Sequence, residues 1–278
     1  MQRLDLTQCA CRVLRCANAQ EKAELTRSFV EDINGQSDRV LIGHDSPDIR
    51  PARPERPELH DPRAMAPSNK RNKGVPKKIV LLHAIAHIEL NAIDLAWDMI
   101  ARFAPLYDEH APEAAYNLPI EFFMDWLSVA GDEAKHFLLL NAHLKHHGAA
   151  YGDLAAHDGL WESAEKTRHD IAARLAIVPM VLEARGLDVT PGMIKNFEAQ
   201  NDSDTASILK IILSEEVNHV RIGRHWFEDY CLRHNKDGLE YWQSLVRHYF
   251  GGKLKPPFNH DKRQDAGMIR DWYEPLAD

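Results

Sequence analysis

Apolar positions along this chain of 278 residues recur mostly with the 3.6-residue period of an α-helix, and no stretch alternates convincingly as a strand would. Four long helices are predicted over residues 77–103, 119–148, 158–186 and 203–230, and shorter ones over 20–33, 190–198 and 239–250. Pro105, Gly148 and Gly186 mark the ends of the first three long patterns. Pro179 lies inside the third and predicts a kink one turn before Glu183. The pattern indicates an all-α fold.

Seven prolines between residues 47 and 76 interrupt any helix there and favour an extended path. A flexible linker is one interpretation, but the segment is not rich in Gly and Ser, which favours a strap laid over the helices. We therefore expect an N-terminal appendage over residues 1–75, a helical bundle over 76–235, and a C-terminal helix and capping tail over 236–278.

Two Glu-x-x-His units lie in the middle of long apolar patterns: Glu133 with His136, and Glu216 with His219. Residues three apart share a helix face, so each unit directs a carboxylate and an imidazole to one point. Two such pairs, with one inward Glu from each of two further helices, can hold two metal ions inside a four-helix bundle. The first and third long helices supply the candidates for these two further ligands, Glu89 and Glu183.

The four carboxylates must lie at one level of the bundle. Glu89 is about 14 residues from its helix end and Glu133 about 14 from its helix start, so an antiparallel pair places them level. Glu183 is about three residues from Gly186, whereas Glu216 is about 13 from its helix start. We predict that the 190–198 helix prolongs the third long helix beyond a break at Gly186, which restores the match.

Other interpretations of these residues stay open. About one Glu-x-x-His unit is expected by chance in such a chain. The four residues of the two units can also form buried ion pairs, although four carboxylates and two imidazoles are poorly balanced without cations. Glu165 with His169 is the alternative to Glu183. His83 and His87 lie four apart without a carboxylate partner and are expected to be supporting or core histidines.

Carboxylate-rich sites with one His per ion suit two iron or manganese ions, with zinc as a substitute. Asp132 and Glu215 directly precede the ligand glutamates and can accept hydrogen bonds from the ligand histidines, or can be helix-surface acids. With His87, they are the expected supporting residues of the centre.

The formal net charge of −8 argues against a dedicated nucleic-acid or anionic-membrane binder. A local basic cluster precedes the first long helix, where a solvated lead-in is favoured over contact with RNA. Its residues are Lys70, Arg71, Lys73, Lys77 and Lys78.

The chain begins without the apolar run of a signal peptide, and no segment reaches about 18 uncharged residues, so a cytoplasmic location is expected. Cys9, Cys11 and Cys16 cluster near the start, which suits reduced thiols better than a disulfide framework. A metal or redox role for this cluster would lack a fourth ligand at suitable spacing.

Several runs of sequence resemble the bacterial ferritin-like family catalogued as domain of unknown function 455. They are residues 87–90, 132–137, 157–161, 181–188, 215–220 and 255–259. The resemblance covers roughly residues 76–259 and leaves the part up to about residue 72 outside. It implies a ferritin-like four-helix bundle and a dinuclear site at Glu89, Glu133, His136, Glu183, Glu216 and His219. The ligand pattern is also similar, more distantly, to the di-iron tRNA hydroxylases (MiaE-like) that oxidise a modified adenosine.

These features predict a di-iron oxidoreductase of monooxygenase type that activates O₂ or peroxide and hydroxylates or oxidises a small-molecule or nucleoside substrate. One alternative is a metal-handling or peroxide-defence protein without an organic substrate, as in ferritins and rubrerythrins. The chain has no rubredoxin-like pair of Cys-x-x-Cys units, which weakens the rubrerythrin version. The other alternative is a scaffold with a structural metal. An electron-donor protein and a homodimer are the further partners we consider.

Overall fold

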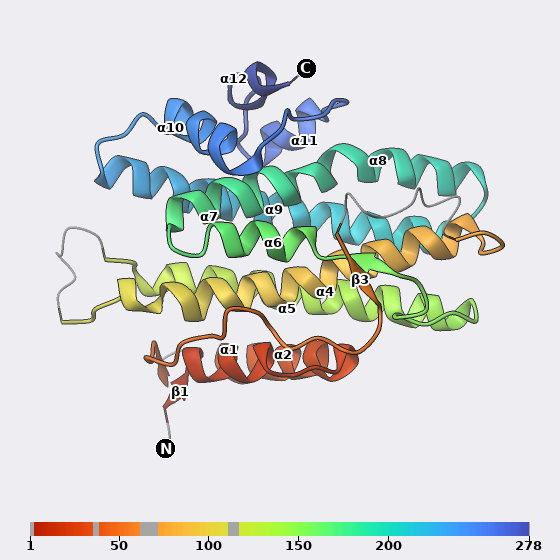
Figure 1. The fold of residues 1–278 in the computed structure, drawn as a ribbon, viewed down its shortest axis with the longest axis horizontal. Coiled ribbons are helices and arrows are strands. Elements are labelled where there is room, and N and C mark those ends of the chain that lie inside the picture. The colour runs from red at the N-terminus through yellow and green to blue at the C-terminus, as the bar shows by residue number, and fades with distance from the viewer. Residues whose placement is uncertain (1–2, 36–38, 62–71, 111–116, 278) are drawn as a thin grey trace. The chain divides into compact units, whose positions relative to one another are not determined.

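The computed structural model describes residues 3–35, 39–61, 72–110 and 117–277. Nearly all of its regular structure is helical (Figure 1), which confirms the all-α prediction. The described residues form two compact units, a first unit up to Glu162 and a second unit from Ser163 onward. This division lies at a different place from the predicted parts 1–75, 76–235 and 236–278, which stay predictions.

The first unit is built on two long neighbouring helices, α4 (Lys77–Phe103) and α5 (Ile120–His146). Both agree closely with the predicted ranges. Pro76 and Pro119 stand immediately before them, where the missing N–H of proline costs no helical hydrogen bond. Gly148 follows α5 with φ at +71°, a left-handed conformation that favours glycine.

Two N-terminal helices cover this pair: α1 (Leu6–Leu14) packs on α4, and α2 (Ala19–Asn34) packs on α5. The N-cap of α1 is Asp5, whose carboxylate accepts from the backbone N–H groups of Thr7 and Gln8. Hydrophobic periodicity predicted α2 but missed α1. The N-terminal segment is therefore part of the core of the first unit.

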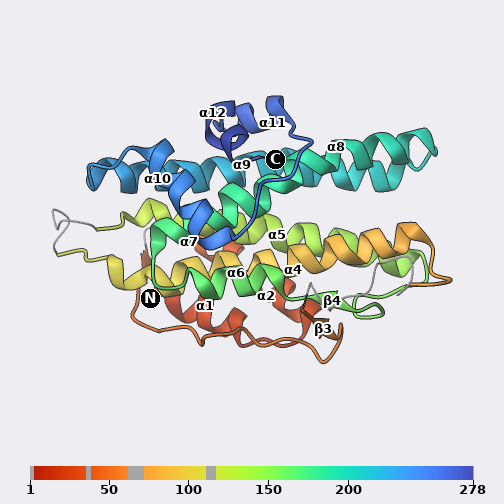
Figure 2. The same cartoon turned by 45° about the horizontal axis from the view of Figure 1, so that its top comes forward.

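The described part of the proline-rich segment, up to residue 61, is a strap on the first unit. The N–H of Ala52 donates to the carbonyl of Leu14 at 2.7 Å. Farther along, β3 (Leu59–His60) pairs in parallel with β4 (Ala156–His157), as Figure 2 shows. A second short parallel pair joins β1 (Leu4–Asp5) to β2 (Val40–Leu41). Pro62 and Pro67 lie outside the described residues.

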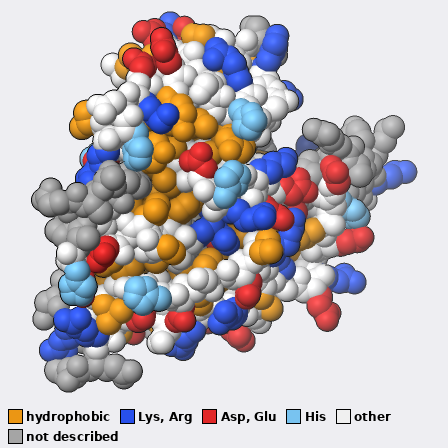
Figure 3. All heavy atoms as spheres, turned by 60° about the vertical axis from the view of Figure 1, so that its left-hand side comes forward, with side chains coloured by type: hydrophobic (Ala, Val, Ile, Leu, Met, Phe, Trp, Pro, Cys, Tyr) orange, Lys and Arg blue, Asp and Glu red, His pale blue; other side chains and the backbone are white. Residues whose placement is uncertain are grey.

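The predicted basic cluster falls partly outside the described residues, because Lys70 and Arg71 belong to the segment 62–71. On the face shown in Figure 3, Lys and Arg side chains are interspersed with Asp, Glu and His and form no continuous basic surface.

The predicted helix over residues 158–186 is wrong as a single element. The chain forms α6 (Gly159–Lys166), leaves the helical path, and starts again at α7 (Ile171–Ile177), where Asp170 caps the new N-terminus. Buried Arg174 donates to the carbonyl of Ala164 at 2.7 Å and to Thr167 Oγ1 at 3.1 Å. The break is possible because this side chain supplies hydrogen-bond donors to acceptors at the end of α6.

Gly186 does not end the helix, which corrects a second prediction. After α7 comes a π-helix, Val178–Glu183, and then α8 (Ala184–Ala199), which passes through Gly186 and Pro191 without interruption. The third long helix is prolonged as predicted, but without a break. Pro191 removes one backbone hydrogen bond, whereas Leu187, Ile194 and Phe197 on the same helix are buried, so packing outweighs the local signal.

The second unit is completed by α9 (Ser203–Arg233), which lies alongside α8, and by the C-terminal elements (Figures 1 and 2). These elements are α10 (Gly238–Leu245), a π-helix Val246–Phe250, α11 (His260–Asp265) and α12 (Arg270–Tyr273). The predicted helix over 239–250 is thus present with a π-helical last turn. The tail returns to the helices through α11, which contacts α8 and α9.

Among the described residues, only the segment Lys77–Leu106, which contains α4, is long and apolar enough to cross a membrane. In the structure 72% of its most apolar window is buried, so much of this surface packs against the rest of the chain. The cytoplasmic location stays a prediction.

Candidate metal centre

A group of three predicted ligands lies in the middle of the first unit: Glu89 from α4, and Glu133 and His136 from α5. Their ligand atoms lie within 4.8 Å of one another. His136 Nδ1 is 3.1 Å from Glu89 Oε2 and 3.4 Å from Glu133 Oε2. The three residues are at most 3% exposed. We call them the first-unit ligand group, and their arrangement can hold a metal ion.

The electrostatics of this group favour a cation. Burial raises the pKa of Glu89 well above its usual value, and the nearby charge of Glu133 raises it further, whereas His136 acts in the opposite direction. Two carboxylates face one imidazole, so when both carboxylates are ionised even a protonated His136 balances only one of the two charges. A cation bound to these oxygens would supply the missing charge.

The second unit carries the other Glu-x-x-His pair on α9. His219 Nδ1 lies 3.6 Å from Glu216 Oε1, and the two residues are 0% and 8% exposed. Valines on the same helix, Val217 and Val220, are buried beside them. The spacing of three residues therefore directs both side chains to one point, as predicted.

Glu183 is the last residue of the π-helix Val178–Glu183 and is half-buried. It lies 16 residues before the end of α8, and Glu216 lies 13 residues after the start of α9, so the two are near one level of the hairpin. The π-helix and α9 can approach each other closely because α9 has a glycine, Gly223, at the point of contact. A Cβ atom there would overlap the ring of Pro179.

The two expected supporting acids lie on α5 and α9. Asp132 forms an ion pair with Lys135 at 3.0 Å on the same helix face. Glu215 is half-buried on α9. Their predicted roles next to the ligand histidines stay predictions.

The alternative ligands on the third helical segment point to separate partners. Glu165 lies 3.8 Å from the guanidinium of Arg168, and His169 Nε2 lies 3.3 Å from the hydroxyl of Tyr249.

His87 belongs to a different network from the first-unit ligand group. Its Nδ1 lies 2.9 Å from the hydroxyl of Tyr151, and its Nε2 lies 3.0 Å from the carbonyl of His157. Burial lowers the pKa of His87 to about 4. His83, one turn earlier, accepts from the N–H of Gly152 at 2.9 Å, and burial lowers its pKa to about 4 as well. Both neutral histidines fasten α4 to the connection that follows α5.

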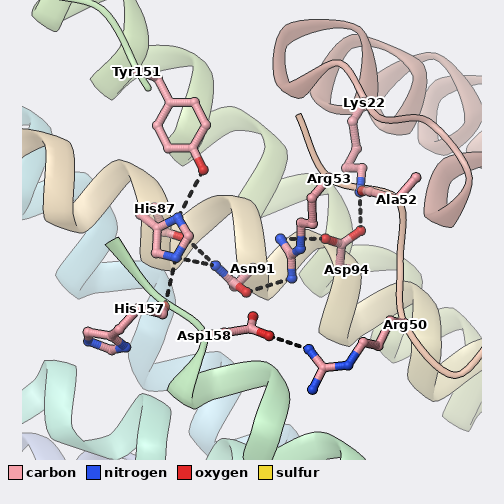
Figure 4. Close-up of polar contacts among 10 residues, drawn as sticks. All are labelled: Lys22, Arg50, Ala52, Arg53, His87, Asn91, Asp94, Tyr151, His157 and Asp158. Atoms are coloured by element: carbon pink, nitrogen blue, oxygen red, sulfur yellow. Dashed lines mark hydrogen bonds and ion pairs between the residues drawn. The ribbon is translucent and has the colours of Figure 1, made fainter. Parts of the chain in front are cut away.

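Sequence reasoning missed a buried ionic network beside His87 (Figure 4). Asp94 of α4 forms ion pairs with Lys22 of α2 and with Arg53 of the strap, the latter at 2.8 Å. Arg53 also donates to Asn91 at 2.6 Å, and Asn91 donates to the carbonyl of His87 at 2.7 Å. The available signal was a carboxylate within the apolar pattern of α4, five residues after Glu89.

The four cysteines are all free. Burial raises the pKa of Cys9 to about 11 and also raises the pKa values of Cys11 and Cys16. Their thiols stay protonated near neutral pH, which makes them poor nucleophiles and poor metal ligands.

A protein-family model described as "Protein of unknown function (DUF455)" matches residues 15–274. The match starts far earlier than the resemblance in the sequence indicated, so placing the segment before residue 72 outside it was wrong. An "Uncharacterized protein" of Haemophilus influenzae is 38% identical, over 93% of this chain and 90% of that protein. No solved structure matches this chain.

Proposed function

This chain belongs to the DUF455 family, and we propose that it is a dinuclear-metal oxidoreductase that activates O₂ or peroxide to hydroxylate or otherwise oxidise an organic substrate. The observation that carries the proposal is the first-unit ligand group. Two carboxylates and an imidazole are buried with their ligand atoms within 4.8 Å, and their own charges do not balance. Such a group is expensive to bury without a cation.

The second unit supplies the remaining ligands in this proposal: Glu216 and His219 from α9, and Glu183 from the π-helix. Each set alone offers only three ligand residues, which is too few for two ions that each need several oxygen or nitrogen donors. Together the sets give four carboxylates and two imidazoles. Four carboxylate charges match two divalent ions.

A bound pair of iron ions would supply the electrons and the open coordination positions needed to activate O₂. The residues of this chain contribute the rest. The carboxyl group of Glu89 would release its proton to bind a metal, since burial has raised its pKa. His136 and the surrounding apolar side chains, Trp126, Val129 and Phe137 on α5, exclude water from the site.

The test is O₂ uptake by protein loaded anaerobically with Fe(II). We expect the full-length protein to consume O₂ in proportion to its bound iron and faster than Fe(II) in buffer. The variants Glu133→Gln and Glu216→Gln should lose this uptake, because each removes a ligand charge from one of the two sets. The exposed Glu240 of α10 provides the control variant Glu240→Gln, which should behave as the wild type.

The same experiment separates oxidase or hydroxylase chemistry from peroxide defence. Rapid, repeated consumption of H₂O₂ without any organic reductant would favour the peroxide-defence alternative. O₂ uptake no faster than that of free Fe(II), and equal in the wild type and both ligand variants, would contradict the proposed function.

A further inference from the structure

Three histidines gather at the C-terminal end of α5, apart from the groups described above. They are His143, His146 and His147, and we call them the α5 histidine cluster. Positions i, i+3 and i+4 share one face of a helix, so the sequence itself places the three imidazoles together. The i, i+4 spacing is also that of the two zinc ligands in a His-Glu-x-x-His helix. The cluster therefore has the spacing of a metal site.

The three rings are close to the separation that a shared metal ion requires. The ring centroids of His143 and His147 are 4.7 Å apart, and those of His146 and His147 are 5.3 Å apart. The remaining separation, between His143 and His146, is 6.5 Å. Imidazoles bound to one tetrahedral zinc ion, with Zn–N bonds of about 2 Å, have centroids about 5 Å apart. The backbone of α5 thus holds the three side chains at almost the spacing of a bound set.

The two outer histidines have ring nitrogens available for a ligand. His146 and His147 are exposed, and their side chains form no hydrogen bond or ion pair with any residue that the structure describes. His143 is 9% exposed and forms the inner side of the cluster. An imidazole that keeps a hydrogen-bond partner on one nitrogen can bind a metal through the other, as ligand histidines usually do.

The ring nitrogens of the cluster are not gathered within 4.8 Å of one another in the structure, unlike the ligand atoms of the first-unit ligand group. Binding of an ion therefore requires the rings of His146 and His147 to rotate about their side-chain bonds. Exposed side chains change rotamer within nanoseconds, so this rearrangement is easy. The ion would assemble the site at the surface, without any movement of the helix.

The position at the end of a helix also favours a cation. The helix α5 has 27 residues, and the carbonyl groups of its last turn form the negative end of the helix dipole. His147 is the C-cap residue at this end. Lys145 is one or two positions from each histidine, so it faces a different side of the helix, where its Nζ lies 3.5 Å from Gln20 Oε1.

Another pair of histidines spaced four apart, His83 and His87 on α4, lacks these properties. Both are buried. His83 Nε2 accepts from the N–H of Gly152, and both ring nitrogens of His87 have partners. Spacing alone therefore does not make a site, and it is the exposure of His146 and His147 that distinguishes the α5 histidine cluster.

We propose that the α5 histidine cluster binds one zinc ion, with the three imidazoles as ligands and water in the fourth position. Imidazole nitrogen is a preferred donor for zinc. This site is separate from the first-unit ligand group, because His143 lies seven residues after His136, about 10 Å farther along the same helix. The inference does not depend on the proposed function.

The test is equilibrium dialysis of the full-length protein against a series of Zn²⁺ concentrations, with the bound zinc measured by mass spectrometry. The double variant His146→Gln and His147→Gln should bind one zinc ion per chain fewer than the wild type, or bind that ion with a Kd at least about tenfold higher. The matched control changes two exposed histidines outside the cluster, His110→Gln and His225→Gln, and should bind zinc as the wild type does.

Glu133→Ala separates this site from the interior centre. It removes a ligand of the first-unit ligand group and should keep the zinc ion of the α5 histidine cluster, so failure of the proposed function leaves this test intact. Circular dichroism and the melting temperature verify that each variant is folded. Equal zinc binding by the wild type and the folded double variant would overturn the proposal, as would an equal loss of zinc in the histidine control.

Discussion

Glu89 is a carboxylate in an apolar environment, which makes it costly to bury. Glu89 lies within the buried stripe of α4 beside Glu133, where an apolar side chain would pack at lower cost. Without metal, its raised pKa favours the protonated form. The residue therefore destabilises the metal-free protein at the pH at which its carboxylate can bind a cation.

Replacing Glu89 with Gln should stabilise the metal-free protein at pH 8 by about 1–3 kcal/mol, because the amide keeps the shape without the buried charge. The sign follows from the raised pKa of Glu89: the stability it confers is present below its usual value of 4.5 and is lost as pH rises through the raised value. Urea denaturation in EDTA measures the effect. A variant less stable than the wild type would contradict it, and Glu240→Gln should change nothing.

The buried histidines of α4 predict the opposite pH dependence. The pKa of His87 is lowered from 6.5 to about 4, so its contribution to stability is present above pH 6.5 and is lost as pH falls toward 4. Between pH 7.5 and 5 the wild type should lose about 2 kcal/mol more unfolding free energy than His87→Gln. Urea denaturation at both pH values provides the comparison. The exposed His110 gives the control His110→Gln, and equal slopes for all three proteins would disprove the assignment.

At the scale of elements, the π-helix Val178–Glu183 determines where Glu183 lies. Pro179 cannot donate a backbone hydrogen bond, and the chain widens into a π-helical turn instead of ending. The turn is held against α9 at Gly223, four residues after His219. Packing at this glycine therefore positions one predicted ligand relative to two others within the second unit.

Gly223→Ala should destabilise the protein by about 1–3 kcal/mol, since the added methyl group overlaps the Pro179 ring. Gly186→Ala is the matched control on the neighbouring helix, because a Cβ at Gly186 meets no atom within 4 Å. That control should be neutral or stabilising by up to about 1 kcal/mol. Thermal unfolding of both variants tests this contact, and equal melting temperatures would exclude it.

The elements that could be predicted from sequence are those whose apolar stripe and end signals agree. For α4 and α5 both signals agreed, whereas α9 was predicted from its apolar stripe alone; all three predicted ranges were close to the observed ones. The two signals conflicted around Gly186 and Pro191, which by themselves favour a helix end. The burial of Leu187 and Ile194 outweighed that preference, and the helix continues. The Glu-x-x-His pairs were found because their spacing is local. The pairing of Lys22 with Asp94, 72 residues apart, has no such local signal.

At the scale of the whole chain, the family match includes most of the N-terminal segment. The family match begins at residue 15, and it includes Lys22 and Arg53, which hold Asp94 of α4. The strap and α2 thus support the helix that carries Glu89.

The most direct measurement is the metal content of the protein, purified without added metal or reconstituted anaerobically with Fe(II), beside Glu133→Ala and Glu216→Ala. We predict about two iron or manganese ions per chain in the wild type. Both variants should lose metal, because one comes from each unit and the proposed centre needs both; Glu240→Ala should keep the full amount. A wild type that binds no metal even after Fe(II) addition, or a folded Glu216→Ala variant with undiminished metal, would contradict a shared dinuclear centre.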